Sequence, residues 1–239
     1  MSQSPVICLI HGHGVDASIW DSIYADLALE TRVLKPDFAY LTSHHTIEAY
    51  AEDLYTQLQT AQVDQVVLVG HSMGGYIALA FAEQHPAMIH GLVLYHSTAL
   101  ADDENRKEVR RHAIEDLKTN GSAPFIQKQL PKMVAPDYPV DKTQQLIDRF
   151  IKLPADALIA GMSAMAGRPD RTHVLREATY PILLVLGRND QIIAHDKAAD
   201  LANLSDYIRI ETIEDAGHLS MVEQPGESFQ ILKAFGTLC

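Results

Sequence analysis

Short runs of apolar residues alternate along this chain with longer stretches in which apolar residues recur every three or four positions. The short runs predict six β-strands, at residues 6–10, 32–35, 66–69, 91–95, 182–186 and 207–213. The third, fourth and fifth runs are almost entirely apolar, as strands are when helices cover both faces of a sheet. Strands that alternate with helical patterns predict an α/β fold: a mostly parallel sheet of about six strands, flanked by helices.

Three stretches carry helical spacing most clearly. Residues 47–61 place their apolar side chains on one face, and Thr46 stands where a helix N-cap is expected. Residues 74–84 are apolar almost all round, which predicts a helix buried against the sheet. The last helix is predicted to begin near Pro225, because proline is favoured in a first helical turn, and to run to about residue 235.

The alternation of strands and helices breaks between about residues 101 and 180. This region shows no strand pattern, and its apolar residues follow helical spacing instead. Helices are predicted at residues 102–120, 124–129, 142–153 and 156–165, with Gly121 ending the first of them. We interpret residues 101–180 as a helical lid, inserted into an α/β core formed by residues 1–100 and 181–239.

Composition narrows the class of protein. A chain of 239 residues forms one α/β domain, or one domain with an insertion. The net charge of −12, from 31 acidic and 19 basic residues, argues against a nucleic-acid partner. Cys8 and Cys239 form no paired framework, so both are expected to be free thiols in a reducing compartment. With no pattern of a signal peptide or a membrane span, we predict a soluble, cytoplasmic protein.

The strand predicted at residues 66–69 runs directly into Gly-His-Ser-Met-Gly-Gly at positions 70–75, and a helix follows at once. Gly-x-Ser-x-Gly between a strand and a helix is the pattern of a nucleophile elbow. The turn is so tight that the neighbouring side chains must be small, which accounts for Gly70 and Gly74. Because the turn pushes its serine hydroxyl into the open, Ser72 is the candidate nucleophile.

A serine hydroxyl needs an adjacent base, usually a histidine that a carboxylate orients. In chains with this elbow the carboxylate follows the serine and the histidine comes last. Asp190 follows the fifth predicted strand and His218 follows the sixth, so both lie where parallel strands place their active sites. Asp196 and Asp215 lie nearby in sequence and are alternatives for the carboxylate.

Together with His-Gly-His-Gly after the first strand, these motifs resemble the lid-bearing serine hydrolases of the α/β-hydrolase superfamily. That group includes small esterases, lactonases, carbon–carbon bond hydrolases and cofactor-free haloperoxidases. The resemblance implies a triad of Ser72 as nucleophile, His218 as general base and Asp190 as the orienting carboxylate. It also implies an oxyanion hole made by the N–H groups of His13 and Met73, and it requires no metal and no cofactor.

The leading hypothesis is a serine hydrolase that cleaves a small ester, lactone or thioester through an acyl-enzyme. The same residues would serve a carbon–carbon bond hydrolase, a perhydrolase or a lyase, and a non-catalytic receptor for a small ligand could retain an intact triad. The expected partner is a small-molecule acyl substrate, with no nucleic acid and no membrane span. The oligomeric state stays open, with a homodimer as one alternative.

For four other features of the sequence, a structural interpretation stands as an alternative to a functional one. His71 and His96 either line the pocket or are buried structural residues. His11 is expected to form hydrogen bonds within its loop rather than to act in catalysis. The segment 168–171, Arg-Pro-Asp-Arg, is predicted to form an ion-paired turn that closes the lid, in preference to binding an anionic substrate.

Overall fold

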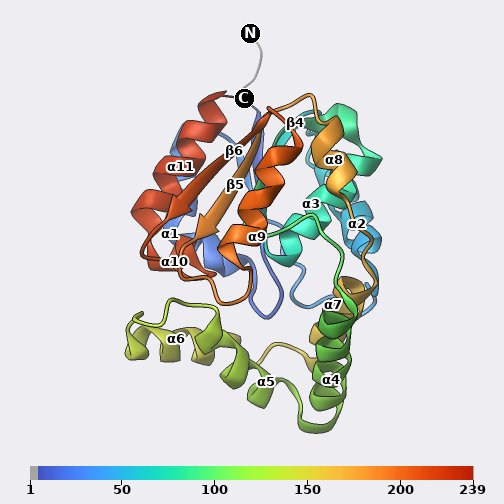
Figure 1. The fold of residues 1–239 in the computed structure, drawn as a ribbon, viewed down its shortest axis with the longest axis vertical. Coiled ribbons are helices and arrows are strands. Elements are labelled where there is room, and N and C mark those ends of the chain that lie inside the picture. Colours follow the sequence, from blue (N-terminus) through green and yellow to red (C-terminus); the bar gives the residue numbers. More distant parts are fainter. Residues whose placement is uncertain (1–4, 239) are drawn as a thin grey trace.

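The structure is a computed structural model that describes residues 5–238 (Figure 1). Its six strands form one parallel sheet in the order β2-β1-β3-β4-β5-β6. The strands are β1 Val6–Ile10, β2 Val33–Leu34, β3 Val66–His71, β4 Ile89–Tyr95, β5 Ile182–Gly187 and β6 Ile208–Ile213. Each coincides with a predicted strand, although β2 is shorter than expected. The predicted α/β fold is therefore confirmed.

The position of each strand in the sheet explains its composition. Every residue of β1, β3 and β5 is buried, because helices cover both faces of the inner sheet. Strand β6 lies at an edge and alternates instead: Ile208 and Ile213 are buried, whereas Arg209 and Glu211 are exposed. The apolar runs of the sequence are thus the core of the molecule.

Helices cover the sheet on both faces (Figure 1). Helix α1 (Asp21–Glu30) packs against α11 (Pro225–Leu238) on one face, and α2 (Ile47–Thr60) packs against α3 (Met73–Gln84) on the other. The Thr46 hydroxyl accepts the N–H of Ala49 at 3.2 Å, so the predicted cap of α2 is present. No helix was predicted at α1, because that helix buries only Ile23 and Leu27 and has little apolar periodicity.

Five helices stand between β4 and β5: α4 Glu104–Asn120, α5 Ser122–Gln129, α6 Val140–Phe150, α7 Ala155–Gly167 and α8 Thr172–Glu177. The first four form a layer beyond the carboxyl ends of the strands (Figure 1). Helix α4 ends at Gly121, whose φ of +76° is a conformation that glycine adopts without strain. Residues 96–181, all of them described, contain no strand. That this layer acts as a lid stays a prediction.

A buried ion pair joins the two ends of this helical layer. Asp102 precedes α4, and its carboxylate lies 2.8 Å from an Nη of Arg168, which follows α7. Arg110 of α4 pairs with the same carboxylate. The guanidinium of Arg168 also lies 3.9 Å from the ring centroid of Tyr76 in α3, a cation–π contact. The layer is therefore anchored to the core through charges that water does not reach.

The second arginine of the segment 168–171 makes a matching anchor. Arg171 is buried, and its guanidinium lies 2.5 Å from Glu48 of α2 and 2.9 Å from Glu83 of α3. Its backbone N–H also donates to the carbonyl of Ala99, in the loop after β4. Both arginines of the segment are thus ion-paired, as the sequence predicted.

Two further predictions concern the cysteines and membrane-spanning helices. Cys8 is a free, fully buried thiol, and burial raises its pKa to about 12. Cys239 lies outside the described residues. Among residues 5–238, no single helix is both long and apolar enough to cross a membrane, whereas α6 and α7 together, bent by 100°, qualify by length and composition alone.

Replacing Asp102 tests the buried anchor. Burial raises the pKa of its carboxyl, but hydrogen bonds from Arg110 and Arg168 outweigh burial and hold that pKa below its usual value. A depressed folded pKa means that the ionised carboxylate stabilises the fold above about pH 4, and that this contribution is lost as pH falls through the folded pKa. Asp102→Asn should therefore lower the free energy of unfolding by about 3 kcal/mol at pH 7.

Denaturant unfolding at several pH values checks this expectation. The difference between wild type and Asp102→Asn should shrink as pH falls below about 4. Glu108→Gln is the matched control, because Glu108 is exposed and, within the described residues 5–238, pairs with Arg111 and His112 on the surface of α4. A difference for Asp102→Asn that stays constant from pH 7 to pH 3 would contradict the role given to its charge.

Candidate active site

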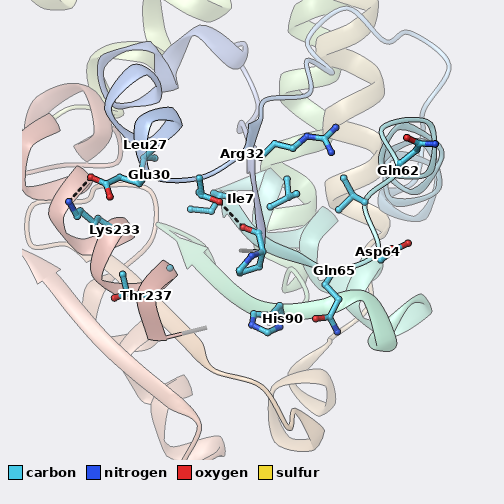
Figure 2. Close-up of a pocket in the computed structure, with 15 residues that line it drawn as sticks. Ile7, Leu27, Glu30, Arg32, Gln62, Asp64, Gln65, His90, Lys233 and Thr237 are labelled. Atoms are coloured by element: carbon cyan, nitrogen blue, oxygen red, sulfur yellow. Dashed lines mark hydrogen bonds and ion pairs between the residues drawn. The ribbon is translucent and has the colours of Figure 1, made fainter. Parts of the chain in front are cut away.

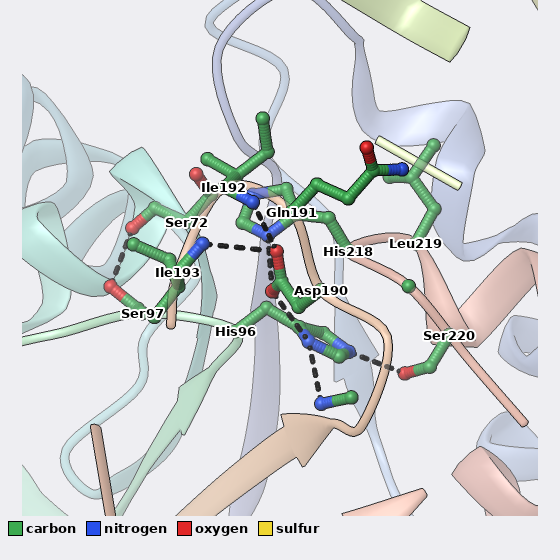
Figure 3. Close-up of polar contacts among 12 residues, drawn as sticks. Ser72, His96, Ser97, Asp190, Gln191, Ile192, Ile193, His218, Leu219 and Ser220 are labelled. Carbon is green, nitrogen blue, oxygen red and sulfur yellow. Dashed lines mark hydrogen bonds and ion pairs between the residues drawn. The ribbon is translucent and has the colours of Figure 1, made fainter. Parts of the chain in front are cut away.

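The turn between β3 and α3 holds Ser72 in strained backbone. Its φ is +52° and its ψ is −114°, a conformation that side-chain-bearing residues rarely adopt. Its N–H donates to the carbonyl of Tyr95 at 3.0 Å, and its own carbonyl accepts the N–H of Gly75 and the hydroxyl of Ser97 (Figure 3). These bonds hold the elbow from both sides and keep the serine at its apex.

Glycine is required on both sides of Ser72 by the closeness of strand and helix. A Cβ on Gly70 would lie 2.4 Å from the carbonyl oxygen of Gly74, and a Cβ on Gly74 would lie 2.4 Å from that of Ile10. Real Cβ atoms do not approach backbone so closely. The small residues predicted for the elbow therefore allow the first turn of α3 to pack directly against the backbone of β1 and β3.

His218 and Asp190 form a buried hydrogen-bonded pair (Figure 3). Nδ1 of His218 lies 2.7 Å from Oδ2 of Asp190, and the two side chains are 1% and 2% exposed. Oδ1 of Asp190 accepts the N–H groups of Ile192 at 2.8 Å and Ile193 at 3.0 Å. Burial alone would raise the pKa of Asp190, but the neighbouring imidazole of His218 outweighs it and holds that pKa well below its usual value.

The structure brings Asp190, and neither alternative carboxylate, to His218. The side chain of Asp196 is fully exposed beside His195. Asp215 is also exposed, although it lies only three residues before His218. Of the three candidate carboxylates, Asp190 is thus the one that contacts His218.

The ring of His218 is poised to accept a proton at one defined atom. Because Nδ1 donates its hydrogen to Asp190, the lone pair of the neutral ring lies on Nε2. Within residues 5–238, Nε2 is buried and has no hydrogen-bond partner, so no hydrogen bond joins it to Oγ of Ser72. Catalytic hydrogen bonds are often long in a free enzyme and shorten when substrate binds.

His71, the residue before the nucleophile, links the elbow to the loop of the candidate base. Its Nε2 donates to the backbone carbonyl of His218 at 2.8 Å, and the two rings lie 4.8 Å apart. Burial lowers the pKa of His71 well below that of an ordinary histidine, so its ring is neutral. Of its two interpretations, the buried structural one applies. His11 donates to Gly12 within its own loop, as predicted, and also accepts from Phe38, in the loop after β2.

Glu223 holds the loop of His218, and sequence reasoning missed it. Its carboxylate accepts three backbone N–H groups, from Ala135 at 2.7 Å and from Gly217 and Leu219 at 3.0 Å each. It thereby joins the loop of His218 to the segment that follows α5. Burial raises the pKa of Glu223 above its usual value. The only signal in the sequence is an acidic residue five positions after the candidate base.

The backbone N–H groups of His13 and Met73 are free to bind an oxyanion. Across residues 5–238, neither donates a hydrogen bond. The ring of His13 is fixed by α7, because its Nε2 donates to the carbonyl of Leu158 in that helix at 2.8 Å. Burial lowers the pKa of His13 to about 4, so this ring is neutral. A Cβ on Gly161 would lie 2.7 Å from the His13 ring, so α7 packs directly on the loop after β1 that holds His13.

A small cavity borders both candidate oxyanion residues. Its walls come from the loop at 11–15, from Met73, from Phe38 and Tyr50, and from Leu153 and α7. A much larger cavity, of about 1100 Å³, lies at the opposite end of the sheet (Figure 2). It is lined by residues at the amino ends of the strands, such as Ile7, Gln65 and His90, so it takes no part in the chemistry at Ser72.

The described side chains include one group close enough to hold a metal ion. It consists of His96, Asp190 and His218, whose ligand atoms lie within 4.8 Å of one another. Oδ2 of Asp190 and Nδ1 of His218 are already joined by a hydrogen bond of 2.7 Å. An ion between them would have to displace the proton that Nδ1 of His218 donates to Asp190.

Comparison with known proteins places these features in a family. A model of the Alpha/beta hydrolase family matches residues 7–230. An uncharacterized protein of Mycobacterium tuberculosis is 33% identical over 112 residues, which are 43% of this chain and 32% of that protein. The chain thus spans about a third of the length of this relative.

Two further proteins match over nearly the whole chain. 3-Oxoadipate enol-lactonase 1 of Acinetobacter baylyi is 25% identical over 243 residues, covering 98% of this chain and 89% of the lactonase. The solved structure of a thermophilic esterase from Thermogutta terrifontis has a TM-score of 0.91 and 27% identity, covering 98% of this chain and 90% of that chain. Both proteins are hydrolases of ester bonds by name.

Replacing Glu223 tests whether its carboxylate positions the loop of His218. Glu223→Gln would turn an amide N–H toward backbone N–H groups that now donate to a carboxylate. The free energy of unfolding should fall by roughly 1–3 kcal/mol, the cost of an unsatisfied buried polar group. Hydrolytic kcat should fall as well, measured on folded protein below the unfolding transition. Unchanged stability and unchanged kcat would show that the three bonds do not hold the loop.

Proposed function

This chain belongs to the α/β hydrolase family, and we propose that it is a serine hydrolase that cleaves a small ester, lactone or thioester through an acyl-enzyme. One observation carries the proposal. A buried His218–Asp190 pair lies at the same edge of the sheet as Ser72, whose left-handed backbone holds it at the apex of an elbow.

The proposed reaction begins when Oγ of Ser72 attacks the substrate carbonyl carbon while Nε2 of His218 takes the hydroxyl proton. Asp190 stays ionised and stabilises the imidazolium that forms. The negative charge on the carbonyl oxygen is bound by the N–H groups of His13 and Met73, and each such donor contributes roughly 3–4 kcal/mol. His218 then gives its proton to the leaving group, and a water molecule activated by the same base releases the acid.

The cavity beside His13 and Met73 has a volume of only about 10 Å³, about that of one water molecule, so an acyl group enters only if side chains move, which favours a small one. Its walls on the side of α7 include Ala157, Leu158 and Gly161, and α7 is fixed in place through the ring of His13. Apolar walls close to the oxyanion donors suit a short alkyl or ring carbon skeleton. The ester and lactone chemistry in the names of the relatives agrees with this class of substrate.

The decisive experiment measures hydrolysis of short p-nitrophenyl esters, small lactones and thioesters by wild type and by Ser72→Ala. Wild type should turn over at least one of these classes, and Ser72→Ala should lose about five to six orders of magnitude in kcat, as removal of a triad nucleophile does. Ser43→Ala is the matched control, because Ser43 is exposed and its hydroxyl bonds to the neighbouring His44 rather than to the candidate triad, and it should match wild type.

Thermal unfolding of all three proteins shows that the loss is chemical. If folded wild type hydrolyses none of these substrates, the receptor alternative gains and the proposed function is wrong. Turnover that survives in Ser72→Ala would assign the chemistry to another residue.

A further inference from the structure

A third histidine stands beside the candidate triad. His96 follows β4 directly, its side chain is fully buried, and its φ of +48° lies in the left-handed region. Its Nδ1 lies 3.2 Å from Oδ2 of Asp190, the oxygen that also receives His218 (Figure 3). On the other side of the same nitrogen, the N–H of Gly187 points at Nδ1 from 3.1 Å. A single ring nitrogen cannot donate to the carboxylate and accept from the amide at once.

The other nitrogen of His96 begins a buried chain of hydroxyl groups. Its Nε2 lies 2.7 Å from Oγ of Ser220, whose hydroxyl donates to Tyr95 at 2.7 Å. The Tyr95 hydroxyl donates to Ser228 at 2.7 Å, and the Ser228 hydroxyl donates to the backbone carbonyl of Ser220 at 2.9 Å. Ser220 and Ser228 are buried completely, as is Tyr95, so water does not complete or compete with these bonds.

Backbone groups fix the direction of this chain at both ends. At one end the amide of Gly187 can only donate, so Nδ1 of His96 must accept. At the other end the carbonyl of Ser220 can only accept, so Ser228, Tyr95 and Ser220 each pass their hydrogen the same way. Both constraints require the hydrogen of His96 to lie on Nε2, where it donates to Ser220.

We propose that His96 is a positioning residue of the candidate triad, locked with its hydrogen on Nε2 so that it withholds a hydrogen bond from Asp190 and leaves the carboxylate to His218. This inference rests on the proposed function. With the opposite tautomer, Nδ1–H of His96 would donate to Oδ2 at 3.2 Å and share the charge that stabilises the His218 imidazolium. His218 would then be a weaker base.

Four groups face His96, of which the Asp190 carboxylate favours a charged ring and the His218 ring opposes it. They are Asp190, the phenol of Tyr95 at 5.0 Å, and the rings of His218 at 5.7 Å and His71 at 6.2 Å, with all three distances between ring centroids. Burial lowers the pKa of His96, so the ring carries one hydrogen whose place is then decided by its partners. The left-handed backbone at this position is a further cost that simple packing would not require.

A spectroscopic test needs no substrate. In protein labelled with ¹⁵N-histidine, long-range ¹H–¹⁵N correlation spectra distinguish the two tautomers of each ring, and His96→Asn identifies the signals of His96. Asparagine is chosen because it tolerates the left-handed backbone of this position. Wild type should show hydrogen on Nε2 of His96. A spectrum with the hydrogen on Nδ1 would overturn the proposal, whether or not the protein hydrolyses esters.

Tyr95→Phe tests the chain without touching the triad. It removes the acceptor of the Ser220 hydroxyl, which can then turn and donate to Nε2 of His96. The Gly187 amide still donates toward Nδ1, but without the hydroxyl chain it alone opposes a charge-assisted bond from Nδ1–H to Asp190, so the hydrogen of His96 should shift in part toward Nδ1 in the spectrum. Ser228→Ala offers a second route, since it removes the acceptor of the Tyr95 hydroxyl. If both folded variants keep hydrogen on Nε2, the chain does not set the tautomer.

The kinetic consequence is measured on any ester that wild type hydrolyses. In Tyr95→Phe the midpoint of the acidic limb of kcat/KM should move down by roughly 0.5–1 pH unit, because His218 becomes a weaker base. Its kcat should fall by about threefold to tenfold, with KM unchanged. Tyr180→Phe, at the amino end of β5, is the matched control and should behave as wild type. If the tautomer of His96 shifts in Tyr95→Phe but the midpoint of the kcat/KM profile does not move, the role given to His96 is wrong. If wild type hydrolyses no ester, the proposed function alone is contradicted.

Discussion

The structure depends on the close contact between the end of β3 and the start of α3. Only glycine fits at positions 70 and 74, since any Cβ there would lie 2.4 Å from a backbone oxygen. This contact bends the chain so sharply that Ser72 adopts a left-handed backbone, which hydrogen bonds from Ser97 and to Tyr95 stabilise. Strand β4 therefore pairs with β3 in the sheet and also holds the elbow through Tyr95. His96, the residue after β4, lies beside Asp190.

Parallel strands bring the remaining groups to the same edge. Asp190 follows β5 and His218 follows β6, and the two loops pack so tightly that a Cβ on Gly187 would meet the carbonyl of Gly217 at 2.1 Å. Four histidines gather there with different hydrogen-bond partners: His218 carries its hydrogen on Nδ1, toward Asp190, and His71 carries its hydrogen on Nε2. His13 is held by α7, and His96 by its hydroxyl chain. Position alone would not separate these roles, whereas the hydrogen-bond partners do.

Much of this arrangement could be predicted from the sequence, because it follows from local patterns. Apolar runs identify all six strands, and the elbow motif identifies Ser72 together with the glycines that flank it. The rest depends on contacts between residues far apart in the chain. Helix α1 escaped prediction because the core receives few of its side chains. Glu223 and the partners of His96 carry no motif, since their roles arise only when loops from β4, β5 and β6 meet.

We propose that the fold activates one serine, Ser72, as a nucleophile. The most direct measurement treats folded protein with a fluorophosphonate probe and locates the adduct by intact mass and peptide mapping. A single adduct is expected, on Ser72, because its half-buried hydroxyl stands at the apex of the elbow, at the same sheet edge as the His218–Asp190 pair. No adduct, or one on a different residue, would contradict it.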